Sequence, residues 1–186
     1  MYGVYTSYSP IVYGGGLVPP GNRTSITDFR VNGWLCDSAV SAEGKLFIQG
    51  GGWNMLTPPG FPAVLPRIGI ALTVDVPYTA TNQNHTLRIS LEGEDGQAMS
   101  LGPEVADPTN PAAVPSPGKI EAQFNVGRPP GLMPGDAQPI PFAINIDGFN
   151  LASPGAYAFV IEIDGTEMDR LVFRAAQAPS NMTIRR

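Results

Sequence analysis

Apolar and polar residues alternate with a period of two along most of this chain. Every second residue from Ile68 to Val76 is apolar, and the same pattern returns at 87–91, 120–126, 157–163 and 171–175. A period of two places the apolar side chains on one face of a β-strand. Strands with one apolar face are typical of antiparallel sheets, because parallel sheets are covered on both faces.

Short turn motifs and proline-rich stretches separate these strands. Glu43-Gly44, Asp95-Gly96 and Asp164-Gly165 predict hairpin turns. The stretches 57–66, 102–118 and 127–139 are rich in proline and glycine, and we expect them to be loops. The sequence therefore predicts an all-β fold, an antiparallel β-sandwich of about 8–9 strands, Ig-like or jelly-roll-like, without a significant helix. A closed barrel is the alternative, since alternation does not separate the two.

The N-terminal segment differs from the rest of the chain. It carries Tyr2, Tyr5, Tyr8 and Tyr13, followed by three glycines, and has too few aliphatic residues to form a core. We predict an extended Tyr/Gly-rich arm at 1–26, a β-sandwich domain at 27–176 and a C-terminal tail at 177–186. Tyrosine suits interfaces, because it buries a large area and keeps a polar tip. The four tyrosines are therefore the predicted interface residues.

Charge and cysteine content narrow the possible partners and location. The net charge is −5 and the sequence pI is about 4.7, so we expect no nucleic acid partner, which would require clusters of Lys and Arg. No apolar stretch reaches the length of a membrane span, and we expect no membrane partner. One cysteine and no recognisable signal peptide favour a cytoplasmic protein, or a virion protein if phage-encoded.

The residues that usually perform catalysis are few. His85 is the single histidine and lies in a polar stretch, so we expect an exposed loop residue. Cys36 lies in a strand pattern and is expected to be a small core residue. Trp34 and Trp53 could form a sugar platform, but packing in the core is favoured. The sequence predicts that the protein is not an enzyme, with no catalytic residues and no cofactor.

Acidic residues offer no recognisable metal motif. The candidates for calcium are Glu92, Glu94, Asp95, Asp147, Asp164 and Asp169. They show no Asp-x-Asp spacing, and turn chemistry explains Asp95 and Asp164, which each precede a glycine. We therefore predict no metal site.

The stretch from Glu43 to Trp53 resembles a family motif. Its sequence, Glu-Gly-Lys-Leu-Phe-Ile-Gln-Gly-Gly-Gly-Trp, is similar to the opening of an uncharacterised, largely actinobacterial and phage family of unknown function. That resemblance implies a small β-protein and assigns no activity or functional residue. Its physical content is a hairpin, with Leu46 and Ile48 expected in the core.

These observations favour a structural or interaction module. We expect a subunit of a homo-oligomer or larger assembly, such as a phage particle, that binds protein partners through its N-terminal arm. The alternative is a ligand- or carbohydrate-binding sandwich with a site at the proline-rich loops.

Overall fold

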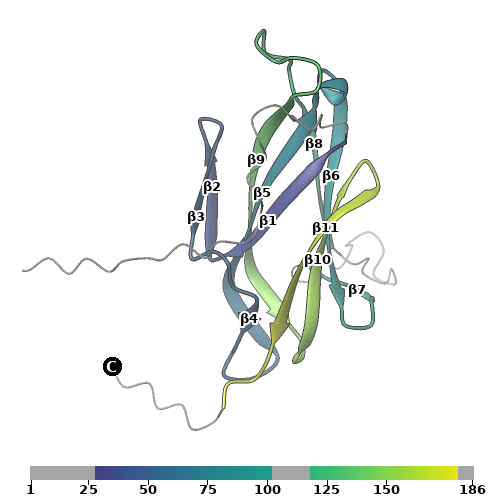
Figure 1. The fold of residues 1–186 in the computed structure, drawn as a ribbon. Coiled ribbons are helices and arrows are strands. Elements are labelled where there is room, and N and C mark those ends of the chain that lie inside the picture. The colour runs from purple at the N-terminus through teal and green to yellow at the C-terminus, as the bar shows by residue number, and fades with distance from the viewer. Residues whose placement is uncertain (1–27, 102–117, 180–186) are drawn as a thin grey trace, which may run out of the picture.

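The computed structural model describes residues 28–101 and 118–179, and this part of the chain is almost entirely β-strand (Figure 1). It contains eleven strands and one short 3-10 turn, η1 (Tyr78–Ala80). No helix among the described residues is long and apolar enough to cross a membrane. Two sheets face each other and form a sandwich, which confirms the predicted fold class.

The smaller sheet has three antiparallel strands. Its order is β1 (Arg30–Cys36), β5 (Ala63–Pro77) and β9 (Ala137–Leu151). β5 lies in the middle, with Trp34 opposite Ala71 on one side and Ala143 opposite Ala71 on the other. These three residues share the outer face of the sheet, whereas Ile70 and Leu72 face the interior.

The larger sheet has six strands. They are β4 (Met55–Leu56), β6 (Asn84–Gly93), β7 (Ala98–Met99), β8 (Lys119–Asn125), β10 (Gly155–Ile163) and β11 (Thr166–Ala175). Their order is β4-β11-β10-β6-β7, and β8 pairs with β6 next to β7. All the pairs are antiparallel except that of β4 with β11.

The core lies between the two sheets and contains the residues that alternation singles out. The largest fully buried side chains are Phe149, Phe159, Phe173, Ile68, Ile70, Leu72, Ile89, Leu91, Leu151, Ile161, Ile163 and Val74. Phe159 and Phe173 stack with ring centroids 5.6 Å apart. Each such side chain stabilises the fold by roughly 1.5–3 kcal/mol relative to exposure.

Two predicted loops are partly strand. β5 contains Pro66 and β9 contains Pro139, where the sequence predicts loop, and β9 also contains Pro141. Proline is tolerated in edge strands, because its missing N–H can lie on the unpaired side. β9 is an edge strand, and β1 pairs with β5 only from Gly69 to Asp75, so Pro66 has a single neighbouring strand.

The remaining two strands form a separate hairpin. β2 (Ser38–Ala42) and β3 (Lys45–Gln49) pair around Glu43-Gly44, as the turn motif predicts. The sequence predicts one strand from Trp34 to Val40, but the chain bends at Asp37 and leaves the sheet. The β2–β3 hairpin stands beside the outer face of the three-stranded sheet (Figure 1).

Candidate interaction surface

His85 is buried, which contradicts the prediction of an exposed loop residue. It lies in β6 with 6% of its surface exposed, between the rings of Phe29 and Phe124 at 4.9 and 5.4 Å. Its Nδ1 lies 2.7 Å from Oδ2 of Asp164, and its Nε2 lies 2.8 Å from the carbonyl oxygen of Ala80. The prediction was based on the polar residues next to His85 in the sequence, whereas its ring is covered by residues that are distant in the sequence.

The contacts of His85 connect two separate parts of the domain. Each ring nitrogen lies within hydrogen-bond distance of an oxygen atom, Nδ1 of the Asp164 carboxylate and Nε2 of the Ala80 carbonyl. Burial alone raises the pKa of the Asp164 carboxyl, but hydrogen bonds from His85 and the N–H of Thr86 outweigh burial and lower this pKa. Through these contacts His85 links η1 to Asp164 in the turn between β10 and β11.

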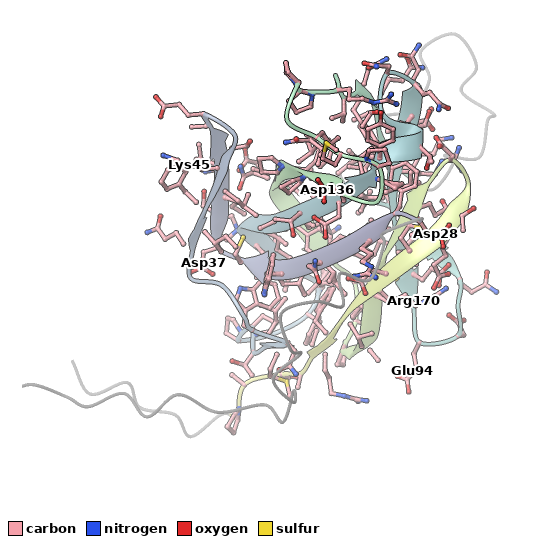
Figure 2. All side chains as sticks on the ribbon, turned by 45° about the horizontal axis from the view of Figure 1, so that its top comes forward. Asp28, Asp37, Lys45, Glu94, Asp136 and Arg170 are labelled. Atoms are coloured by element: carbon pink, nitrogen blue, oxygen red, sulfur yellow. The ribbon has the colours of Figure 1, made fainter. Side chains whose placement is uncertain are left out.

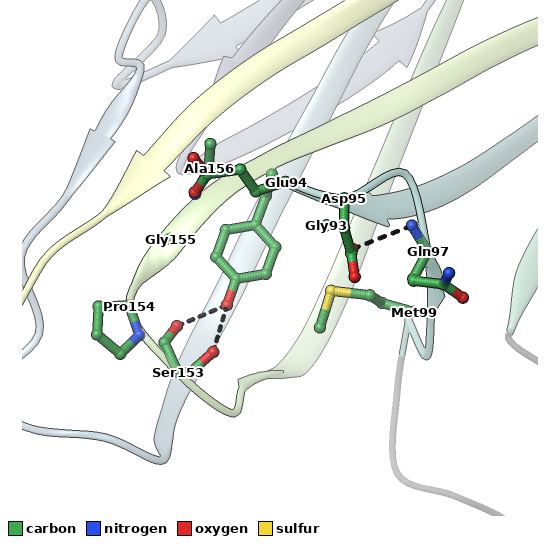
Figure 3. Close-up of a pocket in the computed structure, with 10 residues that line it drawn as sticks. Gly93, Glu94, Asp95, Gln97, Met99, Ser153, Pro154, Gly155 and Ala156 are labelled. Carbon is green, nitrogen blue, oxygen red and sulfur yellow. Dashed lines mark hydrogen bonds between the residues drawn. The ribbon is translucent and has the colours of Figure 1, made fainter.

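Two open cavities of about 480 Å³ lie among the described residues. One is next to His85 and is lined by both apolar and polar side chains, including Phe29, Met168 and Asp164. The other lies at the turns that end β6 and begin β10 (Figure 3). There the hydroxyl of Tyr157 donates to the carbonyl of Ser153 at 2.5 Å, and Asp95 accepts the N–H of Gln97 at 3.2 Å.

The candidate calcium ligands are dispersed. Glu92 pairs with Arg170, Asp147 with Arg67 and Asp164 with His85, while Glu94 lines the cavity at the β6–β7 turn. Asp169 accepts a hydrogen bond from the N–H of Arg170. In residues 28–101 and 118–179 no three His, Cys, Asp or Glu side chains come together in a way that could hold a metal ion.

Cys36 and the two tryptophans occupy separate places. Cys36 is fully buried beneath the hairpin, where burial first and the charge of Asp37 second raise the pKa of its thiol. Trp53 packs against Phe173 at 6.1 Å, at the edge of the core, and Trp34 lies on the outer face of the small sheet. The two rings therefore have different environments.

The predicted interface tyrosines, Tyr2, Tyr5, Tyr8 and Tyr13, lie outside the described residues. Most of the loop 102–118 does so as well. The second proline-rich loop is described from Gly127 onward. In it the Arg128 guanidinium covers the ring of Tyr78 at 3.8 Å and donates to the Tyr78 carbonyl.

The β2–β3 hairpin carries the clearest apolar surface. Val40 and Phe47 lie directly opposite each other in the hairpin, and each is 56% exposed. We call this pair the hairpin patch. On the other face Leu46 packs against Cys36, Ala39 and Ala71, as predicted, but Ile48 is 40% exposed and its prediction as a core residue is wrong.

Asn145 fixes the inner edge of the hairpin. Its side-chain Oδ1 accepts the N–H of Ala39 at 3.0 Å, and its Nδ2 donates to the carbonyl of Ala39 at 2.9 Å. The amide of Asn145 therefore takes the place of a neighbouring strand for β2. As a result β2 faces the sheet, and β3 forms the outer edge of the hairpin.

Comparisons with known proteins identify a family without assigning an activity. No curated protein matches this chain. Among solved structures, it is similar to the Pseudomonas fluorescens alkylpurine DNA glycosylase AlkC bound to DNA containing an abasic site analogue, with 9% identity and a TM-score of 0.38. That match covers 81% of this chain and 30% of the other, and a TM-score this low supports no inference. The model of a family of unknown function, DUF6941, matches residues 33–176. The chain belongs to the DUF6941 family.

Proposed function

We propose that this protein is a non-enzymatic structural or interaction module, a subunit of a homo-oligomer or larger assembly. The observation that supports this most is the hairpin patch, Val40 and Phe47, presented on a hairpin that stands off the sandwich. Apolar side chains at such positions gain free energy when a partner removes them from water. The burial of His85 and the contacts of both its ring nitrogens within the domain support the non-enzymatic part.

The N-terminal arm supplies the second contact in this proposal. Its Tyr2, Tyr5, Tyr8 and Tyr13 are suited to an interface, because each ring buries apolar area at a low cost in side-chain entropy. The family resemblance of the hairpin motif supports a bacterial cytoplasm or a phage particle as the setting of the assembly.

A full-length variant in which the four tyrosines are replaced by serine tests this proposal. We expect its molar mass by light scattering to be lower than that of the wild type at the same concentration. A variant with Tyr78 replaced by phenylalanine is the control, since Tyr78 packs within the domain against Arg128. Equal masses for wild type and the four-serine variant would contradict an interface made by the arm.

The second candidate is a ligand- or carbohydrate-binding sandwich. The cavity bounded by Glu94, Met99 and Tyr157 favours it, because about 480 Å³ lies within the range of small-molecule sites. A glycan array together with a thermal shift screen tests this function, and the absence of any hit would argue against it.

A further inference from the structure

The outer edge of β3 has backbone groups without a partner among the residues that the structure describes. Positive φ angles at Glu43 and Gly44, 52° and 70°, define a two-residue turn, which makes Ala42 and Lys45 a hydrogen-bonded pair. Hydrogen-bonded and non-hydrogen-bonded pairs alternate along antiparallel strands. The pairs Ala39–Ile48 and Ser41–Leu46 therefore turn their N–H and C=O groups away from the other strand.

Ala39 supports this assignment directly. Its N–H and C=O groups bond to the side chain of Asn145 and not to β3. By the same alternation, Leu46 and Ile48 direct their N–H and C=O groups to the outer edge of β3. Within residues 28–101 and 118–179 no other strand pairs with β3. This edge can therefore accept another strand.

We propose that β3 of a second copy of this chain occupies this edge, paired antiparallel about a two-fold axis next to Phe47. The inference deepens the proposed function and rests on it, since it names the partner and the contact. Two-fold homodimers use the same patch on both copies, so a self-complementary strand suits them. The product would be a four-stranded sheet in the order β2-β3-β3-β2.

The parity of the free groups defines the register. Leu46 and Ile48 carry the free groups, so each must lie opposite Leu46 or Ile48 of the other copy. Leu46 opposite the partner's Ile48 uses all of the residues from Lys45 to Gln49. The other two registers shift the strands and lose part of this overlap. The favoured register places Phe47 opposite the partner's Phe47, in a pair whose Cα atoms lie about 4.5 Å apart.

Apolar and charged side chains agree with this register. The two Phe47 rings meet on one face, with Val40 next to each, so that the hairpin patches of both copies form one strip. Figure 2 shows Lys45 toward the tip of the hairpin and Asp37 at its base. Neither has an ion pair among the described residues. Antiparallel pairing brings Lys45 of each copy to the end where the partner's Asp37 lies.

The size of this contact indicates a weak dimer. A five-residue edge buries only part of the 1,200–2,000 Å² that is roughly typical of a stable interface. The N-terminal arm would supply the rest of the area under the proposed function. We therefore expect the strand pairing to be one of two contacts in the assembly.

Disulfide trapping in the full chain tests both the partner and the register. Phe47→Cys is the test variant and Val40→Cys is the matched control, since both positions are 56% exposed and share one face. In the proposed register the Cα atoms at position 47 of the two copies come within disulfide range, which is about 4.4–6.8 Å. The Cα atoms at position 40 of the two copies are separated by about three strand spacings, roughly 14 Å, and stay out of range. Cys36 is buried and should not compete.

We expect mild oxidation at micromolar concentration to link most of Phe47→Cys as a dimer on non-reducing gels, and little of Val40→Cys. Equal cross-linking of both variants, or of neither, would overturn the inference. If the N-terminal arm of the same chain occupied the edge of β3 instead, neither variant would be cross-linked. As a second measurement, Ile48→Pro removes an outward N–H and no hydrogen bond between β2 and β3, so it should lower the dimer fraction while circular dichroism stays unchanged.

The two proposals can fail separately. A wild-type mass above 19.7 kDa that falls in the four-serine variant, without the Phe47→Cys disulfide, would overturn the β3 pairing and leave the proposed function standing. A monomeric wild type without the disulfide would overturn both.

Discussion

Replacing Asn145 by alanine should loosen the hairpin from the sheet that carries it. The change removes two hydrogen bonds, of 3.0 and 2.9 Å, between the Asn145 side chain and Ala39. Each such bond contributes about 0.5–1.5 kcal/mol net, and Ala39, which is 2% exposed, has little access to water as a replacement. We expect the free energy of unfolding to fall by about 1–3 kcal/mol. For a domain of this size the midpoint temperature should fall by roughly 2–4 °C per kcal/mol.

Urea denaturation followed by tryptophan fluorescence measures this loss. Amide hydrogen exchange should also quicken in residues 38–49 and stay unchanged in β10, because the lost bonds hold only the hairpin. The control is Asn125→Ala, which removes one exposed side-chain bond to Asn84 and should cost less than about 0.5 kcal/mol. If Asn145→Ala and Asn125→Ala lose the same stability and hairpin exchange is unaltered, Asn145 does not position the hairpin.

Three further changes test the packing and the charges of the domain. The pKa of the Asp164 carboxyl is lower in the folded state than in the unfolded state, where it is about 4. The charged carboxyl therefore stabilises the fold above about pH 4, and this contribution disappears as the pH falls through the folded pKa. The stability difference between wild type and Asp164→Asn should therefore shrink below about pH 4 in urea titrations; a constant difference would be inconsistent with this linkage. Gly69→Ala places a Cβ 2.6 Å from Sγ of Cys36 and should lower the free energy of unfolding by about 1–3 kcal/mol in urea denaturation. The control Gly60→Ala places its Cβ in open space and should change this free energy little. Equal losses in the two variants would refute the close approach at Gly69. Cys36 is buried and its thiol pKa is raised, so native alkylation should be far slower than that of free cysteine, and a similar rate would show an accessible thiol.

Local patterns predict the strands and their faces well. The period of two places Ile70, Leu72 and Val74 on the inner face of β5, because the direction of a side chain in a strand depends only on parity. The turns at Asp95-Gly96 and Asp164-Gly165 also form hairpins as predicted, because Gly96, Asp164 and Gly165 adopt the positive φ angles that glycine and aspartate tolerate.

Features that depend on distant residues could not be predicted. Proline at 66 and 139 led to the prediction of loop, and only the order of the strands reveals that each position has an unpaired side. His85 has polar sequence neighbours, but its ring is buried by Phe29, Phe124 and Asp164. The burial of such a residue depends on tertiary packing and not on its local sequence.

The candidate surface was partly predictable. The sequence predicts the turn, and the pairing of Val40 with Phe47 follows once the structure limits this turn to Glu43-Gly44. Their exposure does not, because it depends on the hairpin leaving the sheet at Asp37 and resting on Asn145. The tyrosines of the arm remain a prediction, since they lie outside the described residues.

The molar mass of the full-length protein as a function of concentration tests the proposed function most directly. Sedimentation equilibrium should give a mass above the 19.7 kDa of one chain, rising with concentration, and Phe47→Ser should lower that mass at each concentration. A mass of 19.7 kDa at every concentration, identical in both proteins, would contradict a self-assembling subunit.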